Sequence, residues 1–391
     1  MRVQIASLCL LLLLTTGLIH AQQPQHVHGF AIEKKPNAWY AQQIVLWKAE
    51  LDKNPTNGYA WYNYYRATRN QIRLDTTDKR THMEKAAVLA NLVNEMEKAV
   101  PQSFEFNLCK WMNGGNDYEH YLPYLKKAAQ LGPDRMELIS DVLTWAEIER
   151  DIAKRDLYAQ KWYASPMSSP GLLYYNHNVL AGLKPNAILI TQGDNDTYPA
   201  WILQSQGIRR DVTVINTSLL NIDVYREKVF KELGIAKWPV TATNSLKDTT
   251  VASCNRYKNE LVKHLAANNK KYPVYLALTG DDELTKPIAD QLYLTGLAYE
   301  YSPITLDNIA LMKKNFEQVY TLDYIDKPFY QDISVYWSKH CLNNYIVPMI
   351  KLYDHYKTSG DAIHMDWMKK KILFIIKGTP EEQNTLTYLN N

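Results

Sequence analysis

The residues best suited to chemistry lie in one short stretch, Gly193-Asp194-Asn195-Asp196-Thr197, which follows an apolar run. Asp194 and Asp196 are two residues apart, and carboxylates at that spacing in a turn can share a hard divalent cation, with oxygen from Asn195 or Thr197. A cation held there would carry a diphosphate group or assist hydrolysis. The same residue types also accept backbone N–H groups and cap helices, so a structural role is an open alternative.

Similar polar residues follow two further apolar runs, Val212–Ile215 and Val274–Leu278. The first run, Ala187–Thr191, and Val212–Ile215 are short, rich in β-branched residues and bounded by polar turns, which is typical of buried parallel strands, and Val274–Leu278 is expected to be a third strand. Open parallel sheets bind ligands beyond the carboxyl ends of their strands, so we expect the polar residues to gather at one edge. The candidate ligand-binding residues are Asp194, Asn195, Asp196, Thr197, Asn216, Ser218, Asn221 and Asp281.

An enzyme built on this edge would need a general base, for which His177 and Asp223 are the nearest candidates in sequence. A histidine such as His177 is more commonly a partly buried, hydrogen-bonded side chain. The sequence contains no G-x-S-x-G, P-loop, G-x-G-x-x-G or His-Glu-x-x-His motif, which removes the commonest hydrolase, kinase and dinucleotide-binding classes. The enzyme hypothesis is therefore a metal-dependent reaction on glycan or phosphate groups.

The alternation of strands with helices predicts an α/β fold whose parallel, Rossmann-like sheet occupies residues 172–305. A fourth strand or strand pair is expected within residues 291–301. Turn-forming residues 165–171 mark the start of this domain. Residues 306–391 are expected to form a C-terminal helical segment.

Residues 37–165 are expected to be helical, with a repeated pattern of amphipathic helix, proline turn and new helix. Pro101 and Pro133 are 32 residues apart, close to the 34-residue period of tetratricopeptide repeats. The pattern predicts a degenerate tetratricopeptide-like domain that stacks its helices and binds a protein partner. An irregular helical domain without a repeat function is the alternative.

The N-terminus has the pattern of a secretory signal peptide over residues 1–21: Arg2, an apolar core at Leu8–Leu14, and Ala21 at the end. An uncleaved anchor is the alternative, but the apolar run is short for a membrane span. Residues 22–36 are polar and predict a flexible leader, in which His26 and His28 lack a third metal ligand. With no later long apolar stretch, we expect an exported protein without a transmembrane segment, in the periplasm or associated with the outer membrane.

Composition excludes some partners. The formal net charge is +3 with acids and bases mixed along the chain, and no basic block indicates a nucleic acid. After the predicted signal peptide, Cys109, Cys254 and Cys341 are scattered, which permits at most one internal disulfide and shows no metal-binding spacing.

Several phrases resemble the soluble C-terminal region of a Bacteroidota membrane-protein family described as protein O-mannosyltransferase-like. They are Gly193–Pro199, Gly207–Val212, Asn216–Asn221 and Gly296–Tyr299, in matching order within residues 172–301. The resemblance implies an envelope protein whose α/β domain faces the periplasm and recognises a glycan, a lipid-linked sugar or an acceptor protein. The membrane portion, where the family's transferase chemistry is expected, is replaced here by the predicted signal peptide and helices, so glycosyl transfer is not carried over.

Together these patterns predict an exported envelope binding or scaffold protein. Its repeat helices would hold a protein partner, and its strand-end loops would bind a polar or glycan ligand, with a divalent cation as the candidate cofactor. The two alternatives are the metal-dependent enzyme and a purely structural subunit of an envelope complex.

Overall fold

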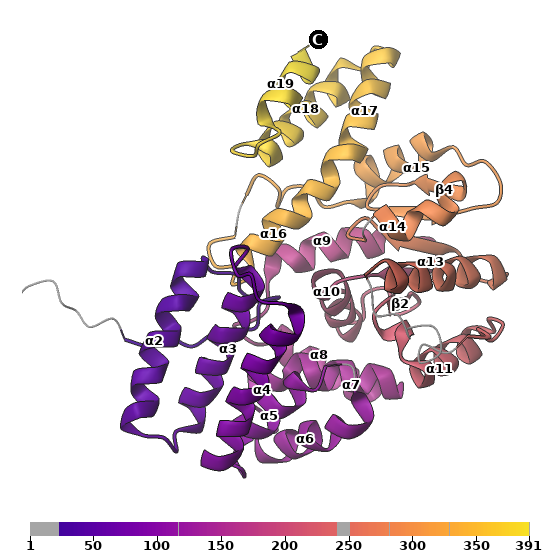
Figure 1. Cartoon of the computed structure of the whole chain (residues 1–391). Helices are drawn as coiled ribbons and strands as arrows, with labels where there is room; N and C mark the ends of the chain where they lie inside the picture. Colours follow the sequence, from indigo (N-terminus) through magenta and orange to yellow (C-terminus); the bar gives the residue numbers. More distant parts are fainter. Residues whose placement is uncertain (1–22, 116, 241–250, 281, 328, 391) are drawn as a thin grey trace, which may run out of the picture. The chain divides into compact units, whose positions relative to one another are not determined.

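The computed structural model describes residues 23–115, 117–240, 251–280, 282–327 and 329–390. The predicted signal peptide and Asp281 lie outside these residues. The chain divides into two compact units (Figure 1). Residues up to Phe30 together with Lys35–Leu138 form the first unit, and Ala31–Lys34 together with Ile139–Asn391 form the second.

The first unit is helical. Each of its helices buries apolar side chains, and several begin at a polar residue that caps the helix. Asn57 caps one helix through a hydrogen bond from the backbone N–H of Ala60 (3.1 Å), and Thr81 and Glu84 form a capping box at another. Its helices are α2 (Asn37–Lys53), α3 (Gly58–Leu74), α4 (His82–Ala99), α5 (Phe104–Asn113), α6 (Tyr118–Leu131) and the 3₁₀ turn Met136–Leu138.

The predicted helical domain of residues 37–165 extends beyond this unit. Its last two helices, α7 (Ile139–Glu149) and α8 (Ile152–Tyr163), belong to the second unit. There α8 packs on α10 (Asp194–Ser205), and Thr144 of α7 shares a hydrogen bond with Tyr198 of α10 (2.9 Å). The boundary between the units therefore falls at Leu138, ahead of the turn-rich residues 165–171 that the sequence marks.

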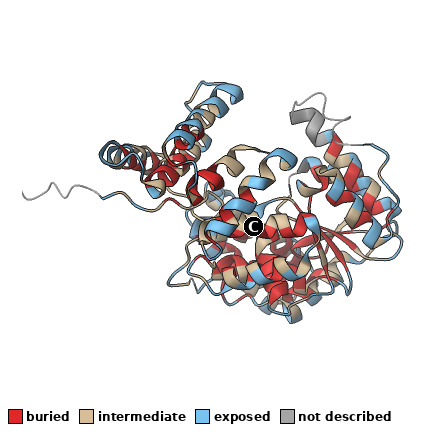
Figure 2. Ribbon diagram, turned by 90° about the horizontal axis from the view of Figure 1, so that it is seen from below, coloured by how far each residue is buried: buried red, intermediate tan, exposed pale blue. Residues whose placement is uncertain are grey.

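The second unit contains one sheet of five strands among its described residues, in the order β2-β1-β3-β5-β4. β1 (Ile188–Thr191) lies between β2 (Thr213–Asn216) and β3 (Val274–Ala277) and is parallel to both. The α/β prediction is compatible with this arrangement. β1 and β3 are completely buried, whereas β4 and β5 combine buried and half-buried residues (Figure 2).

The predicted parallel sheet is present only in part: β1, β2 and β3 are parallel, but the sheet as a whole is mixed and is not clearly Rossmann-like. β5 (Ala298–Tyr301) is antiparallel to β3, and β4 (Leu292–Leu294) is antiparallel to β5, so the sheet is mixed. The reason is the length of the β4–β5 connection. Two strands joined by a tight turn can pair only as an antiparallel hairpin, since a parallel pair needs a long crossover.

Helices surround this sheet in the second unit, and α8 and α9 both pack on α10. No helix among the described residues is long and apolar enough to span a membrane. Cys109 and Cys341 are buried free thiols. The remaining α-helices are α9 (Pro170–Ala181), α11 (Asp223–Leu233), α13 (Val251–Asn268), α14 (Asp282–Thr285), α15 (Asn308–Lys314), α16 (Val335–Leu342), α17 (Ile346–Ser359), α18 (Ala362–Ile376) and α19 (Glu382–Asn390).

The turn between β4 and β5 packs closely against Tyr320, and this packing can be tested by substitution. Gly296 has a φ of 140°, and a Cβ atom there would lie 2.2 Å from the Tyr320 hydroxyl oxygen. Gly207 also has a positive φ, of 90°, but a Cβ atom there would meet nothing within 4 Å. We predict that Gly207→Ala lowers the free energy of unfolding by about 1 kcal/mol through backbone strain alone. Gly296→Ala should lower it by about 3 kcal/mol, because overpacking adds to the strain.

Urea denaturation of the two variants measures this difference. Equal losses would show that Tyr320 is not packed against the turn.

Candidate functional site

The carboxyl ends of β1, β2 and β3 lie at one edge of the sheet, because the three strands are parallel. We call this the strand-end edge and define it as residues 192–197, 216–221 and 278–280. β1 and β2 end in register, with Thr191 opposite Asn216. The loops that follow the three strands therefore lie at the same edge of the sheet, as the sequence predicted.

Asp196 joins the loop after β1 to the loop after β3. Its carboxylate accepts hydrogen bonds from the backbone N–H groups of Gln192 and Gly193, both at 2.9 Å, and from the hydroxyl of Thr279. The side chain is 3% exposed. Burial raises the pKa of Asp196, while its hydrogen bonds, first among them the one from Thr279, act to lower it.

Thr197 and Asn216 join the loop after β1 to the loop after β2. The Thr197 hydroxyl donates to the carbonyl of Gly193 (2.6 Å), and it accepts from Asn216 Nδ2 (2.9 Å). Asn216 Oδ1 in turn accepts from the backbone N–H of Ser218 (2.8 Å). Both side chains are buried. The three strand-end loops are thus tied together by side chains that are saturated with internal hydrogen bonds.

The structure places the other predicted residues differently. Asp194 and Ser218 are exposed, and Asn195 and Asn221 are partly exposed. Asn195 contributes its backbone carbonyl, which accepts from Asn176 Nδ2 (2.9 Å). The side-chain oxygens Asn221 Oδ1 and Thr217 Oγ1 are buried without a hydrogen-bond partner.

These contacts favour the capping role over the cation role for Asp196. Its two oxygens are occupied by three donors, and a cation would have to displace them. Within the part of the chain that the structure describes, no group of three or more His, Cys, Asp or Glu side chains is arranged to hold a metal ion. Of the two candidate bases, Asp223 is paired with Arg226, and His177 is partly exposed on α9.

A second candidate site lies in the first unit, where residues 23–30 run along α2 and α3. We call these residues the N-terminal segment. It has almost no regular secondary structure of its own, yet Val27 is fully buried. The sequence predicted a flexible leader here, whereas this segment packs against the helices.

Side chains of α2 and α3 satisfy the backbone of the N-terminal segment. Gln43 Oε1 accepts from the N–H of Gln25 (2.7 Å), whose carbonyl accepts from Trp47 Nε1 (2.9 Å). Asn63 Oδ1 accepts from the N–H of Val27 (2.7 Å). On the same face of α3, two turns further along, Asn70 Nδ2 donates to the carbonyl of His28 (3.1 Å).

His26 packs beside these contacts. Its Nδ1 atom is 2.9 Å from the Tyr59 hydroxyl, and its ring meets the His28 ring edge-on with centroids 4.6 Å apart. Burial, followed by the neighbouring His28 and Arg66, lowers the pKa of His26 to about 4. His26 is therefore neutral at pH 7.

Gln43, Asn63 and Asn70 were not among the site residues predicted from the sequence. All three are almost completely buried, at 2%, 0% and 2% exposure. Buried side-chain amides need partners, and Asn63 and Asn70 are seven residues apart on a helix rich in aromatic residues. The spacing of these two amides on an apolar helix face is the feature of the sequence that could have indicated a binding surface.

The comparisons with known proteins bear on the second unit. The family model described as TMEM260-associated domain 2 matches residues 174–234, which run from α9 to the end of α11 and include two of the three strand-end loops. The match is consistent with a TMEM260 or O-mannosyltransferase-like family. Neither the curated proteins nor the solved structures give a match to the chain.

The strand-end contacts predict opposite outcomes for its two aspartates. Asp196→Ala leaves two partly buried backbone N–H groups and the Thr279 hydroxyl without their acceptor, and should lower the free energy of unfolding by about 3 kcal/mol. Asp194→Ala removes an exposed acid from the first turn of α10, which should lower it by less than about 1 kcal/mol. Chemical denaturation of both variants is the measurement, and a stable Asp196→Ala would contradict the capping role.

The lowered pKa of His26 predicts acid sensitivity. An unfolded histidine binds a proton near pH 6.5, whereas folded His26 does so only near pH 4, so stability is complete above pH 6.5 and is lost as the pH falls towards 4. At pH 5 the loss should be about 1 kcal/mol, after allowance for partial exposure. Thermal unfolding at pH 7.5 and pH 5 should show it, and His26→Gln should remove it.

His120 is the control for this experiment. The carboxylate of Asp117 raises the pKa of His120, so this histidine contributes stability below pH 6.5 that is lost as the pH rises. His120→Gln should therefore not relieve the acid-side loss. Equal acid sensitivity in the wild type and His26→Gln would contradict the assignment to His26.

Proposed function

We propose that this chain is an exported envelope binding protein. Its helical unit holds a segment of a protein partner, and its strand-end edge binds a polar or glycan ligand. The observation that carries the proposal is the set of hydrogen bonds from α2 and α3 to the backbone of the N-terminal segment. These helices have the groups needed to hold a non-helical polypeptide, and that segment stands in for the partner's.

The recognition would depend little on the partner's sequence. Gln43, Trp47, Asn63 and Asn70 all contact backbone atoms of the N-terminal segment, and every polypeptide offers those atoms. The only side chain that this segment buries completely is that of Val27. A partner segment would therefore need a small aliphatic residue at one position, and it would compete with residues 23–30 for the helices. A degenerate tetratricopeptide-like array would present such a surface.

Export and an envelope location rest on the sequence. Arg2, the apolar core Leu8–Leu14 and Ala21 match a secretory signal peptide, and the resemblance across residues 172–301 suggests a Bacteroidota envelope. We propose that the mature chain works in the periplasm or at the outer membrane.

The proposal of a ligand at the strand-end edge rests on the exposed polar side chains of its loops. Asp194 and Ser218 are exposed on loops that Asp196 and Thr197 hold in place. A glycan carries many hydroxyl donors and acceptors, which suits such a surface.

The partner-binding proposal predicts that the helices bind a free peptide once the N-terminal segment is removed. A labelled peptide of residues 23–30 is titrated into a chain that starts at Ala31, and fluorescence anisotropy should show saturable one-to-one binding. Asn63→Ala should weaken binding about tenfold, the equivalent of one lost hydrogen bond of 1.4 kcal/mol. Asn91→Ala changes an exposed asparagine of α4 and should have no effect.

If the shortened chain is unfolded, the full chain with Val27→Asp replaces it, because a buried carboxylate should expel the segment while leaving the helices in place. A folded acceptor that does not bind the peptide, or that binds it equally well with Asn63→Ala, would contradict the proposal.

A further inference from the structure

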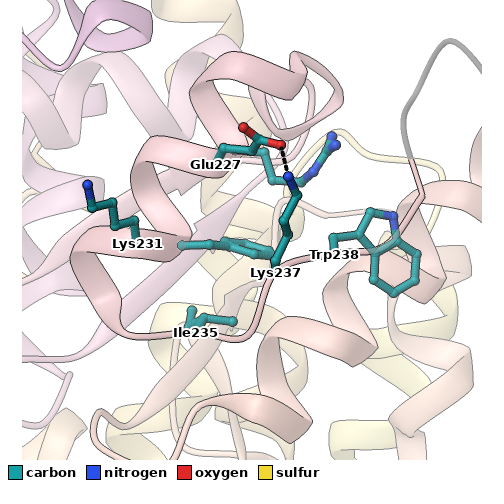
Figure 3. Close-up of a pocket in the computed structure, with 7 residues that line it drawn as sticks. Glu227, Lys231, Ile235, Lys237 and Trp238 are labelled. Atoms are coloured by element: carbon teal, nitrogen blue, oxygen red, sulfur yellow. Dashed lines mark ion pairs between the residues drawn. The ribbon is translucent and has the colours of Figure 1, made fainter.

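A cavity of about 260 Å³ lies beside α11, separate from the strand-end edge. Its walls come from α11 and from the chain that follows it, residues 235–238, as Figure 3 shows. We call it the α11 pocket. None of the predicted site residues lines it.

The pocket exists because the chain reverses at Gly234. This glycine has a φ of 68°, in the left-handed region that favours glycine, and the N–H of Ile235 donates to the carbonyl of Phe230 (2.8 Å). That is the hydrogen bond of a glycine-terminated helix. The reversal brings Ile235 and Trp238 back alongside α11.

The walls are apolar and fixed in place. Phe230 and Ile235 are 2% and 6% exposed. The Nε2–H group of His264, on α13, donates a hydrogen bond to the carbonyl of Ala236 (2.7 Å). Its ring lies 4.9 Å from the Trp238 ring and 6.0 Å from the Phe230 ring, measured between centroids. His264 therefore contacts both aromatic side chains of the pocket, Phe230 and Trp238.

The polar groups of the pocket are mainly cationic. Lys237 pairs with Glu227 at 2.8 Å (Figure 3), but both side chains are more than half exposed. Such a pair is worth about 1 kcal/mol or less, so an anion can compete for the lysine. Lys231 has no ion-pair partner among the described residues. The buried Arg226 is already engaged by the Leu220 carbonyl and by Asp223.

We propose that the α11 pocket binds a small anion built on a planar apolar ring. The ring would lie between Trp238, Phe230 and Ile235, and the carboxylate or phosphate would pair with Lys231 or Lys237. The volume is just below the roughly 300 Å³ at which small-molecule sites usually begin, which limits the ligand to one or two rings. A neutral sugar fits less well, because the apolar walls leave its hydroxyl groups without partners.

This site is independent of the proposed function, since it uses neither the N-terminal segment nor the strand-end edge. The test is a calorimetric titration of the full chain with 2-naphthoate, whose uncharged counterpart 2-naphthamide has the same ring. We expect saturable one-to-one binding of 2-naphthoate, with 2-naphthamide at least fivefold weaker. Trp238→Ala should weaken 2-naphthoate binding at least tenfold.

Charge reversal provides a test that leaves the apolar walls intact. Lys231→Glu together with Lys237→Glu should weaken 2-naphthoate at least tenfold and leave 2-naphthamide unchanged, whereas the exposed Lys263→Glu on α13 should change neither. Three results would overturn the proposal: no saturable binding to the folded chain, equal binding of the two probes, or 2-naphthoate binding that survives the double charge reversal.

Discussion

Buried backbone N–H and C=O groups need hydrogen-bond partners, and this constraint shapes both candidate sites. Where strands end or a segment lacks regular structure, the main chain cannot pair with itself. In this chain, amide, hydroxyl and carboxylate side chains take over. Asp196 accepts hydrogen bonds from backbone N–H groups in the turn after β1. Asn63 and Gln43 accept hydrogen bonds from backbone N–H groups of the N-terminal segment. In both places a buried polar side chain pairs with backbone groups that lack a main-chain partner.

The same interaction has different consequences in the two places. At the strand-end edge, the bonds link loops whose ends are already fixed by strands, so Asp196 and Thr197 act as clamps and are not available to a ligand or cation. Along α2 and α3, the bonds hold a segment without strands or helices to fix it. A surface that satisfies the backbone of such a segment also suits the backbone of another chain. The first network therefore stabilises the fold, and the second is the better candidate for recognition.

Local sequence patterns predicted much of this structure. The predictions failed where the arrangement depends on contacts between residues far apart in the sequence. The strands at residues 188–191, 213–216 and 274–277 follow from short apolar runs between polar turns. The direction of β4 and β5 depends on the turn at Gly296, which periodicity does not report. The choice between cation and cap at Asp196 depends on Thr279, 83 residues away. Residues 23–30 have no periodicity, and the amides that hold Val27 and His28 lie 36 and 42 residues further along.

Amide hydrogen exchange of the full-length protein tests the central claim most directly, namely that α2 and α3 hold the backbone of the N-terminal segment. The account predicts that the Gln25 and Val27 amides exchange at least about a hundredfold more slowly than in a free peptide of residues 23–30, because each donates to a side chain of the helices. Exchange of these two amides at the free-peptide rate, while the α3 amides stay protected, would contradict it.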